Sequence, residues 1–304
     1  MRIVFMGTPD FAVPSLRRMI DDGHEIIGVY TQPDKPKNRG MKLIPTPVKA
    51  LAVEHGLTVY QPLSVRDEAV LDEIRAMEPD LLVVVAYGKI LPKALLEIPK
   101  ITAINVHSSL LPRYRGAAPI NWAILQGDEV TGVTVQHIGE ALDAGDIVVA
   151  KETPIDPEED ALQLYTRLSE LGAEALSEAV RAFADGTATR TPQSGEETVY
   201  AAMLSREMSP IDWNKTARDI VNQVRGLIPW PCATMELEGK RVKVFRAAVG
   251  EDTGKSAGSI VFADKRGIAI AAGDGKCVVI RELQPEGSKR MESAAYLLGH
   301  PIKV

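Results

Sequence analysis

The sequence is poor in cysteine and has no long apolar run. Its 304 residues include two cysteines, Cys232 and Cys277, and neither belongs to a Cys-x-x-Cys or Cys/His spacing. We therefore expect reduced side chains and no structural zinc site, as in cytosolic proteins. No apolar run approaches the roughly 20 residues that cross a bilayer. The N-terminus, MRIVFMGTPD, favours a first strand over a signal peptide. These features predict a cytoplasmic protein with no membrane partner.

Several common catalytic and cofactor motifs are also missing. Gly7 follows the first predicted strand, but no second glycine comes before Gly23. The G-x-G-x-x-G turn of dinucleotide-binding proteins is therefore absent, and nicotinamide or flavin binding is not expected. Ser108 and Ser109 follow His107 without a G-x-S-x-G elbow, which argues against a serine hydrolase. His107 has no second histidine two to five residues away, so we expect no metal site there.

Apolar strands alternate with helix-like segments in the first part of the chain. The predicted strand 80–86 begins with Asp80 and continues as an uninterrupted apolar run, which is typical of a parallel strand covered on both faces. We expect strands at 2–6, 25–31, 58–60, 80–86, 101–106, 132–138 and 147–155, and helices at 11–20, 48–55, 67–77, 93–96, 119–126 and 159–184. This alternation predicts an α/β fold, a Rossmann-like doubly wound sheet with right-handed crossovers.

The predicted secondary structure changes near residue 206, from alternating strands and helices to closely spaced short strands. A helix is expected at 211–226, followed by short β segments at 232–237, 241–249, 259–263, 268–272 and 277–283. Such closely spaced strands favour a small OB-like β-barrel. The expected organisation is a catalytic domain at 1–186, a linker at 187–206 and the barrel domain at 207–304.

Charge is distributed unevenly along the chain. Residues 1–205 carry 19 Lys and Arg against 29 Asp and Glu, whereas residues 206–304 carry 16 against 12. A polyanion would therefore prefer the second part of the chain or a local basic loop in the first. The segment 31–49 is such a loop, rich in proline, with a single acid, Asp34; its basic residues are Lys35, Lys37, Arg39, Lys42 and Lys49. It is either a solvated loop or a basic finger that grips phosphates.

A polar set marks the end of the predicted strand 101–106. Asn105 and His107 lie two residues apart and so share one face of a strand, and Asp143 follows about forty residues later. An amide can donate to a developing oxyanion, an imidazole can exchange a proton near neutral pH, and a carboxylate can orient that imidazole. Asp146 is a second acid in the same segment, and we favour Asp143. With no nucleophilic side chain in the set, the nucleophile is expected to be a substrate amine.

These motifs resemble a known family. The residues that carry the resemblance are Asn105-Val-His107, Ser109-Leu-Leu-Pro112, Arg113-Tyr-Arg-Gly116 and Leu142-Asp143-Ala-Gly145. The spacing is similar to that of the 10-formyltetrahydrofolate-dependent formyltransferases. The opening Gly7-Thr-Pro-Asp10 and the later Pro229-Trp-Pro231 are similar to the branch of this family that acts on methionyl-tRNA. The resemblance covers essentially the whole chain.

The resemblance implies an activity and roles for individual residues. It implies transfer of the formyl group of 10-formyltetrahydrofolate to the α-amine of initiator methionyl-tRNA for translation initiation, catalysed by Asn105, His107 and Asp143, without a metal. The implied folate-binding residues are Tyr87, Gly88, Ile90, Leu91, Ser109, Leu110, Leu111, Pro112, Leu142, Gly145 and Asp146. The resemblance implies that Arg39 contacts the acceptor end of the tRNA and that the barrel lies against the tRNA backbone. From the basic character of the same loop, we expect Lys35, Lys37 and Lys42 to bind the tRNA together with Arg39. We expect a monomer.

Two alternatives remain open on the sequence. One is a folate-dependent formyltransferase that acts on a small amine, such as a nucleotide sugar or glycinamide ribonucleotide. A small acceptor needs neither the basic 31–49 loop nor the barrel. The other is an RNA-binding module whose α/β half is inactive, and the intact set of Asn105, His107 and Asp143 argues against it.

Overall fold

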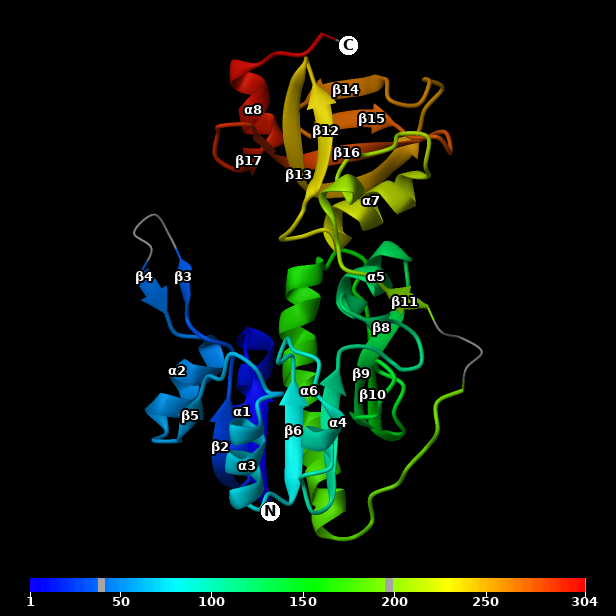
Figure 1. The fold of residues 1–304 in the computed structure, drawn as a ribbon. Coiled ribbons are helices and arrows are strands. Elements are labelled where there is room, and N and C mark those ends of the chain that lie inside the picture. The colour runs from blue at the N-terminus through cyan, green and yellow to red at the C-terminus, as the bar shows by residue number, and fades with distance from the viewer. Residues whose placement is uncertain (38–41, 195–198, 304) are drawn as a thin grey trace. The chain divides into compact units, whose positions relative to one another are not determined.

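The computed structural model describes residues 1–37, 42–194 and 199–303, and the chain packs as two compact units (Figure 1). The first unit comprises Met1–Gly116, Thr131–Thr153 and Tyr165–Tyr200. The second comprises Ala117–Val130, Pro154–Leu164 and Ala201–Val304. Among the described residues, no helix combines the length and the apolar character needed to cross a membrane.

The first unit is built on a seven-stranded sheet with the strand order β10-β9-β7-β6-β1-β2-β5. Its strands are β1 (Arg2–Gly7), β2 (Glu25–Tyr30), β5 (Val59–Tyr60), β6 (Leu81–Val85), β7 (Thr102–His107), β9 (Val130–His137) and β10 (Ile147–Pro154). The neighbouring strands β5, β2, β1, β6 and β7 are parallel to one another, and β9 is antiparallel to β7. This confirms the expected Rossmann-like sheet and adds an antiparallel edge.

Burial follows from the apolar run of β6. All five residues of β6 are buried, as expected for a central parallel strand covered on both faces. On one face, Val4 of β1 and Val84 of β6 form a core cluster with Ile74. The helices of this part of the chain are η1 (Asp10–Ala12), α1 (Val13–Asp21), α2 (Pro47–Glu54), α3 (Glu68–Ala76), α4 (Lys93–Leu96) and α6 (Ala161–Ala184).

The segment 31–49 is not a plain loop, and that expectation was wrong. It contains an antiparallel hairpin of β3 (Lys35–Lys37) and β4 (Lys42–Ile44), followed by the start of α2. Proline is tolerated in such an isolated ladder because a two-stranded hairpin consists of edge strands. Lys49 is also not a free cation, because its Nζ lies 2.6 Å from Asp34 Oδ2 and 2.7 Å from Gln61 Oε1.

The second unit contains a six-stranded antiparallel sheet with the order β12-β13-β16-β15-β14, in which β17 also pairs with β16. The strands are β12 (Ala233–Leu237), β13 (Lys240–Asp252), β14 (Ile260–Asp264), β15 (Gly267–Ala271), β16 (Lys276–Pro285) and β17 (Met291–Glu292). The long strand β13 pairs with both β12 and β16, and register shifts interrupt its ladder with β16. Such bulges let one strand bend between two layers of a curled sheet. The expected run of short strands is confirmed.

Helices complete the second unit. They are α5 (Pro119–Leu125), α7 (Ala217–Gly226) and α8 (Ser293–Gly299), and α7 packs its buried residues into the core of the sheet. The expected start of this helix at Ile211 was wrong. Thr216 caps α7, since its side chain accepts a hydrogen bond of 3.1 Å from Asp219 N. Asp212–Lys215 forms a separate turn before it.

The segment 187–206, expected as a linker, carries short regular pieces. Thr191 exchanges backbone hydrogen bonds with Ile147, at the start of β10. Further along are β11 (Tyr200–Ala201), which pairs with β8 (Arg115–Gly116), and η2 (Arg206–Met208). The first part of this segment is therefore hydrogen-bonded to the seven-stranded sheet at β10.

Candidate active site

The candidate site lies where the central parallel strands end. The ladder places Asn105 of β7 beside Val84 of β6, and on its other side beside Gln136 of β9. After β6 the chain turns through Tyr87 and Gly88, and the Tyr87 carbonyl accepts a hydrogen bond of 3.0 Å from Thr8 Oγ1. This is the edge of an open α/β sheet where ligands bind.

The imidazole of His107 is buried and oriented by a backbone carbonyl. The side chain is only 7% exposed, and its Nε2 lies 2.9 Å from the carbonyl oxygen of Tyr114. A carbonyl oxygen can only accept, so Nε2 carries a hydrogen in either charge state of the ring. The other nitrogen, Nδ1, lies 3.7 Å from Asp143 Oδ1, which is longer than a hydrogen bond. Nδ1 is therefore the atom of His107 that can exchange a proton.

Asp143 is held in an uncommon backbone conformation. Its φ is 49°, in the left-handed region, which costs a non-glycine residue on the order of 1–3 kcal/mol. Its carboxylate accepts hydrogen bonds from Gly116 N at 2.9 Å and from Gln136 Nε2 at 3.3 Å. These bonds aim the carboxylate at the ring of His107. The alternative acid, Asp146, is bound by Arg190 Nε at 3.2 Å, so the geometry favours Asp143.

Gln193 fastens the loop that carries Asp143. Its Nε2 lies 3.0 Å from the carbonyl oxygen of Asp143, 2.7 Å from that of Gly145 and 3.1 Å from Gln136 Oε1. Its Oε1 accepts two hydrogen bonds from the guanidinium of Arg115. Sequence reasoning missed this residue because it lies in the expected linker, 48 to 78 positions from its partners. No local signal could have found it.

Asn105 is the member of the set whose side chain is free for a ligand. It lies on β7 and is half-buried, and within the described part of the chain its amide makes no hydrogen bond to protein. A partly buried amide without a protein partner is costly unless water or a ligand satisfies it. Asn105 is therefore suited to donate a hydrogen bond to a substrate oxygen.

Ser109 serves the structure of the turn after β7. It is fully buried, and its hydroxyl donates a hydrogen bond of 2.7 Å to the carbonyl oxygen of Arg113. Thr134 donates to the Ser109 carbonyl at 2.7 Å and accepts from Leu111 N at 3.1 Å. The side chain of Ser109 can therefore act neither as a nucleophile nor as a direct ligand of folate.

The other expected folate residues differ in exposure. Tyr87 and Leu111 are buried, and burial raises the pKa of the Tyr87 phenol to about 12. Ile90 and Leu142 are exposed apolar side chains, with 79% and 64% of their surface accessible. The remaining residues are half-buried or exposed: Gly88, Leu91, Leu110, Pro112, Gly145 and Asp146. Leu142 directly precedes Asp143, and Ile90 follows β6, the strand that pairs with β7 and Asn105. Exposed apolar side chains in these places suit a flat ring system such as a pterin.

The structure describes some of the expected tRNA-binding residues but not all of them. Lys35 is exposed on β3, and the ladder pairs Lys37 with Lys42. Arg39 lies outside the described residues. In the ranges 1–37, 42–194 and 199–303, no group of three or more His, Cys, Asp and Glu side chains is arranged to hold a metal ion.

Comparison with known proteins defines the class of this protein. Residues 1–180 match the model of the formyl transferase family, and residues 203–301 match that of the formyl transferase C-terminal domain. The chain belongs to the formyl transferase family.

Individual relatives show which members of the family this chain is similar to. The methionyl-tRNA formyltransferase of Geobacter sulfurreducens is 50% identical over 303 residues, which cover 100% of this chain and 95% of the relative. That of Clostridioides difficile is 46% identical over 304 residues, covering 100% and 98% of the two chains. A sugar 3N-formyl transferase, WlaRD, has the same fold, with a TM-score of 0.69 at 18% identity over 95% of this chain and 99% of that one. HypX from Aquifex aeolicus in complex with tetrahydrofolic acid gives a TM-score of 0.64 at 21% identity, over 98% of this chain and 47% of that one.

Proposed function

We propose that this protein transfers the formyl group of 10-formyltetrahydrofolate to the free α-amine of methionyl-tRNA, giving N-formylmethionyl-tRNA. One observation carries the proposal. Asn105 and His107 stand two residues apart at the carboxyl end of β7, and Asp143 lies 3.7 Å from the ring of His107, in a chain that is 50% identical over 303 residues to a methionyl-tRNA formyltransferase.

The reaction needs no nucleophilic side chain. Ser109 is buried and hydrogen-bonded, and both cysteines, Cys232 and Cys277, are buried in the second unit. The attacking lone pair therefore belongs to the α-amine of the acceptor, which forms a bond to the formyl carbon while the bond from that carbon to N10 breaks. A free α-amine has a pKa of about 7.7–8.0, so a useful fraction is already neutral at physiological pH.

The protein stabilises charge and moves a proton. The amide of Asn105 donates to the formyl oxygen as it becomes negative, the role of an oxyanion hole. Nδ1 of His107 accepts the proton that leaves the amine and can return one to N10. Asp143, 3.7 Å from Nδ1, stabilises the imidazolium that forms between these steps.

The co-substrate fits the residues at this edge of the sheet. Among the residues that the structure describes, the amide of Asn105 has no hydrogen-bond partner, so it is available to a substrate acceptor. The exposed side chains of Ile90 and Leu142 offer apolar surface for a ring. Folate supplies the activated formyl group. Three of the expected folate residues have buried side chains and would support the residues that contact folate without touching it themselves: Tyr87, Ser109 and Leu111.

The acceptor is a charged tRNA and not a small amine. The hairpin presents Lys35 as an exposed residue of β3, and the ladder pairs Lys37 of β3 with Lys42 of β4. Arg39 belongs to the same basic segment of the sequence. Lysine and arginine clusters of this kind neutralise phosphates along a nucleic-acid backbone. Because the acceptor takes part in translation, the reaction belongs in the cytoplasm. The candidate site is supplied by one chain, so a monomer suffices.

The test compares acceptors under one set of conditions. Purified protein and 10-formyltetrahydrofolate are incubated with methionyl-initiator tRNA, free methionine or a nucleotide-linked amino sugar, and formylated product is measured. We expect transfer to the charged tRNA at least a hundredfold faster than to either small amine. Faster transfer to the amino sugar would establish the small-amine alternative instead.

A further inference from the structure

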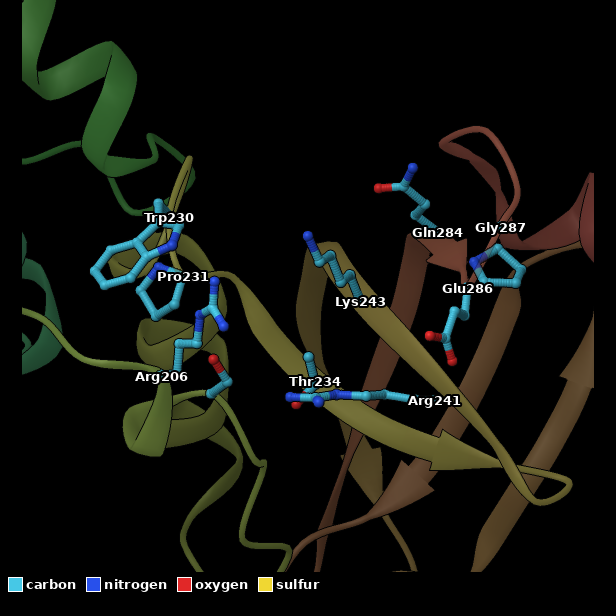
Figure 2. Close-up of a pocket in the computed structure, with 11 residues that line it drawn as sticks. Arg206, Trp230, Pro231, Thr234, Arg241, Lys243, Gln284, Glu286 and Gly287 are labelled. Atoms are coloured by element: carbon cyan, nitrogen blue, oxygen red, sulfur yellow. The ribbon is translucent and has the colours of Figure 1, made fainter. Parts of the chain in front are cut away.

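A hollow opens on the outer face of the six-stranded sheet in the second unit (Figure 2). Its volume is about 480 Å³, within the range of roughly 300–1,000 Å³ typical of small-molecule sites. Its lining consists of Arg206, Ser209, Trp230, Pro231, Thr234, Arg241, Lys243, Gln284, Pro285, Glu286 and Gly287. None of the residues of the candidate active site lines it, and the proposed mechanism does not use it.

A row of polar side chains crosses the floor of this hollow. The strand register places Thr234 of β12 opposite Lys243 of β13, and Lys243 opposite Gln284 of β16. Side chains alternate along a strand, so the flanking Val242 and Val244 point into the core, where both are fully buried. The floor therefore offers a hydroxyl, an ammonium and an amide side by side, on a surface that the core does not use.

The hollow is lined by more positive than negative side chains. Arg206, Arg241 and Lys243 face it, against the single carboxylate of Glu286. Arg241 stands opposite Glu236 of β12 in the strand register, and Glu286 also lines the hollow, so carboxylates are close to Arg241 in the fold. Arg206 and Lys243 have no ion-pair partner among the residues that the structure describes. Two cations are thus available to an anionic ligand.

An exposed indole forms one rim. Trp230 leaves 49% of its surface accessible, and it is followed by the buried Pro231. Figure 2 shows Trp230 and Arg206 on one side of the hollow, Gln284 and Glu286 on the other, and Lys243 between them. An exposed aromatic face next to cations is the arrangement with which proteins bind a base and its phosphate together.

We propose that this hollow binds a single nucleotide, with its base stacked on Trp230 and its phosphate held by Arg206 and Lys243. Gln284 can hydrogen-bond the edge of the base, because an amide both donates and accepts. A base stacked inside a duplex does not expose its face, so the nucleotide is unpaired. Its source is an unpaired position of the bound tRNA, which rests on the proposed function, or a free nucleoside monophosphate.

The experiment uses the full chain and three substitutions in the hollow. Trp230→Ala removes the stacking surface, Trp230→Phe retains a ring, and Lys243→Gln removes one cation from an exposed position. Lys276→Gln is the matched control, because Lys276 is exposed on the same sheet but lies outside the hollow. Circular dichroism melting checks that each variant folds. Binding of 5′-AMP, adenosine and inorganic phosphate is measured by calorimetry, and binding of uncharged initiator tRNA by filter retention across a salt series.

The expected result is specific to the nucleotide chemistry. Trp230→Ala weakens binding by about fivefold to about 150-fold, the range found for loss of one stacked base, and Trp230→Phe weakens it less. Lys243→Gln reduces the salt slope for tRNA by about one. Lys276→Gln binds like the unmodified protein. If the substitutions act on both ligands, the nucleotide belongs to tRNA; if they act on 5′-AMP alone, the ligand is a free nucleotide.

Two results would overturn the proposal. Unchanged binding of both tRNA and 5′-AMP in Trp230→Ala and Lys243→Gln would leave the hollow without this role. Displacement of 5′-AMP by an equal concentration of inorganic phosphate would reduce it to a simple anion site. Formyl transfer to methionyl-tRNA is assayed in parallel with the unmodified protein. Its absence would refute the proposed function, whereas binding of 5′-AMP would still be measured.

Discussion

Replacing Gln193 by glutamate tests how the Asp143 loop is held in place. The substitution preserves the size of the side chain and the oxygen that accepts from Arg115. It removes the two N–H donors of Nε2, which serve the carbonyl oxygens of Asp143 and Gly145 and the side chain of Gln136. Gln193 is a positioning residue in this account, since it acts on the site through Asp143.

The magnitude follows from the number of donors. Two N–H groups are shared among three acceptors, and each hydrogen bond contributes about 1 kcal/mol, which gives roughly 2 kcal/mol in total. That energy is similar to the cost of about 1–3 kcal/mol of holding Asp143 at a φ of 49°. Without these bonds the loop leaves its observed conformation in most molecules. A loss of about 2 kcal/mol corresponds to a decrease of about thirtyfold in kcat.

Steady-state formylation of methionyl-tRNA measures this effect. We expect kcat to fall by about thirtyfold while KM for tRNA changes less than about twofold, because Gln193 acts on the chemical step and not on binding. Gln126→Glu is a control with the same chemical change, in a helix C-cap outside the candidate site. If Gln193→Glu keeps the kcat of the unmodified protein, the loop does not depend on this residue. If Tm falls but kcat does not, Gln193 is only structural.

Three further predictions concern the same unit. Gly145→Ala places a Cβ about 1.7 Å from the carbonyl oxygen of His137, so the loop that carries Asp143 must shift and the rate of formylation should fall at least tenfold. In the control Gly139→Ala, the added Cβ meets no described atom within 4 Å, so this variant should keep its rate. Equal rates in the two variants would argue against a role for this loop in the site. Changing Lys35, Lys37, Arg39 and Lys42 to glutamine should flatten the salt dependence of KM for tRNA, by up to about 0.9 for each phosphate that is no longer neutralised, and an unchanged slope would argue against a phosphate-gripping hairpin. Burial lowers the pKa of His137 below its ordinary value of 6.5, so the unfolded chain binds more protons than the folded chain, and the free energy of unfolding falls as the pH drops below about 6.5. In urea denaturation at pH 5 and pH 7, His137→Gln should reduce that fall. An identical pH dependence in the two proteins would contradict this prediction.

The parallel sheet and the polar set at its edge could be predicted from the sequence because their signals are local. The apolar run that follows Asp80 required a strand buried on both faces, and the two-residue spacing of Asn105 and His107 required one shared direction. Parallel strands end at the same edge of a sheet. Asn105 and His107 therefore followed from strand order and spacing. Asp143 lies much further along the chain, and its assignment rested on its segment and on the family resemblance.

Other features could not be predicted because their causes are distant or compete with a local pattern. Gln193 contacts residues 48 to 78 positions away, and no periodicity marks such a contact. The hairpin containing Pro36 was hidden by prolines that usually indicate a loop. The start of α7 was misplaced because Ile211 continues the apolar pattern of the helix, whereas the cap at Thr216 sets its true beginning.

The central claim is that Asn105 stabilises the charge that develops on the formyl oxygen. Asn105→Asp tests it most directly, because the side chain keeps its size while its donor is replaced by a negative oxygen at a half-buried position. The measurement is the single-turnover rate of formyl transfer to methionyl-initiator tRNA with saturating protein and 10-formyltetrahydrofolate. The account predicts a rate at least about a hundredfold to a thousandfold below that of the unmodified protein, with unchanged Tm. A rate within tenfold of the unmodified protein would contradict it.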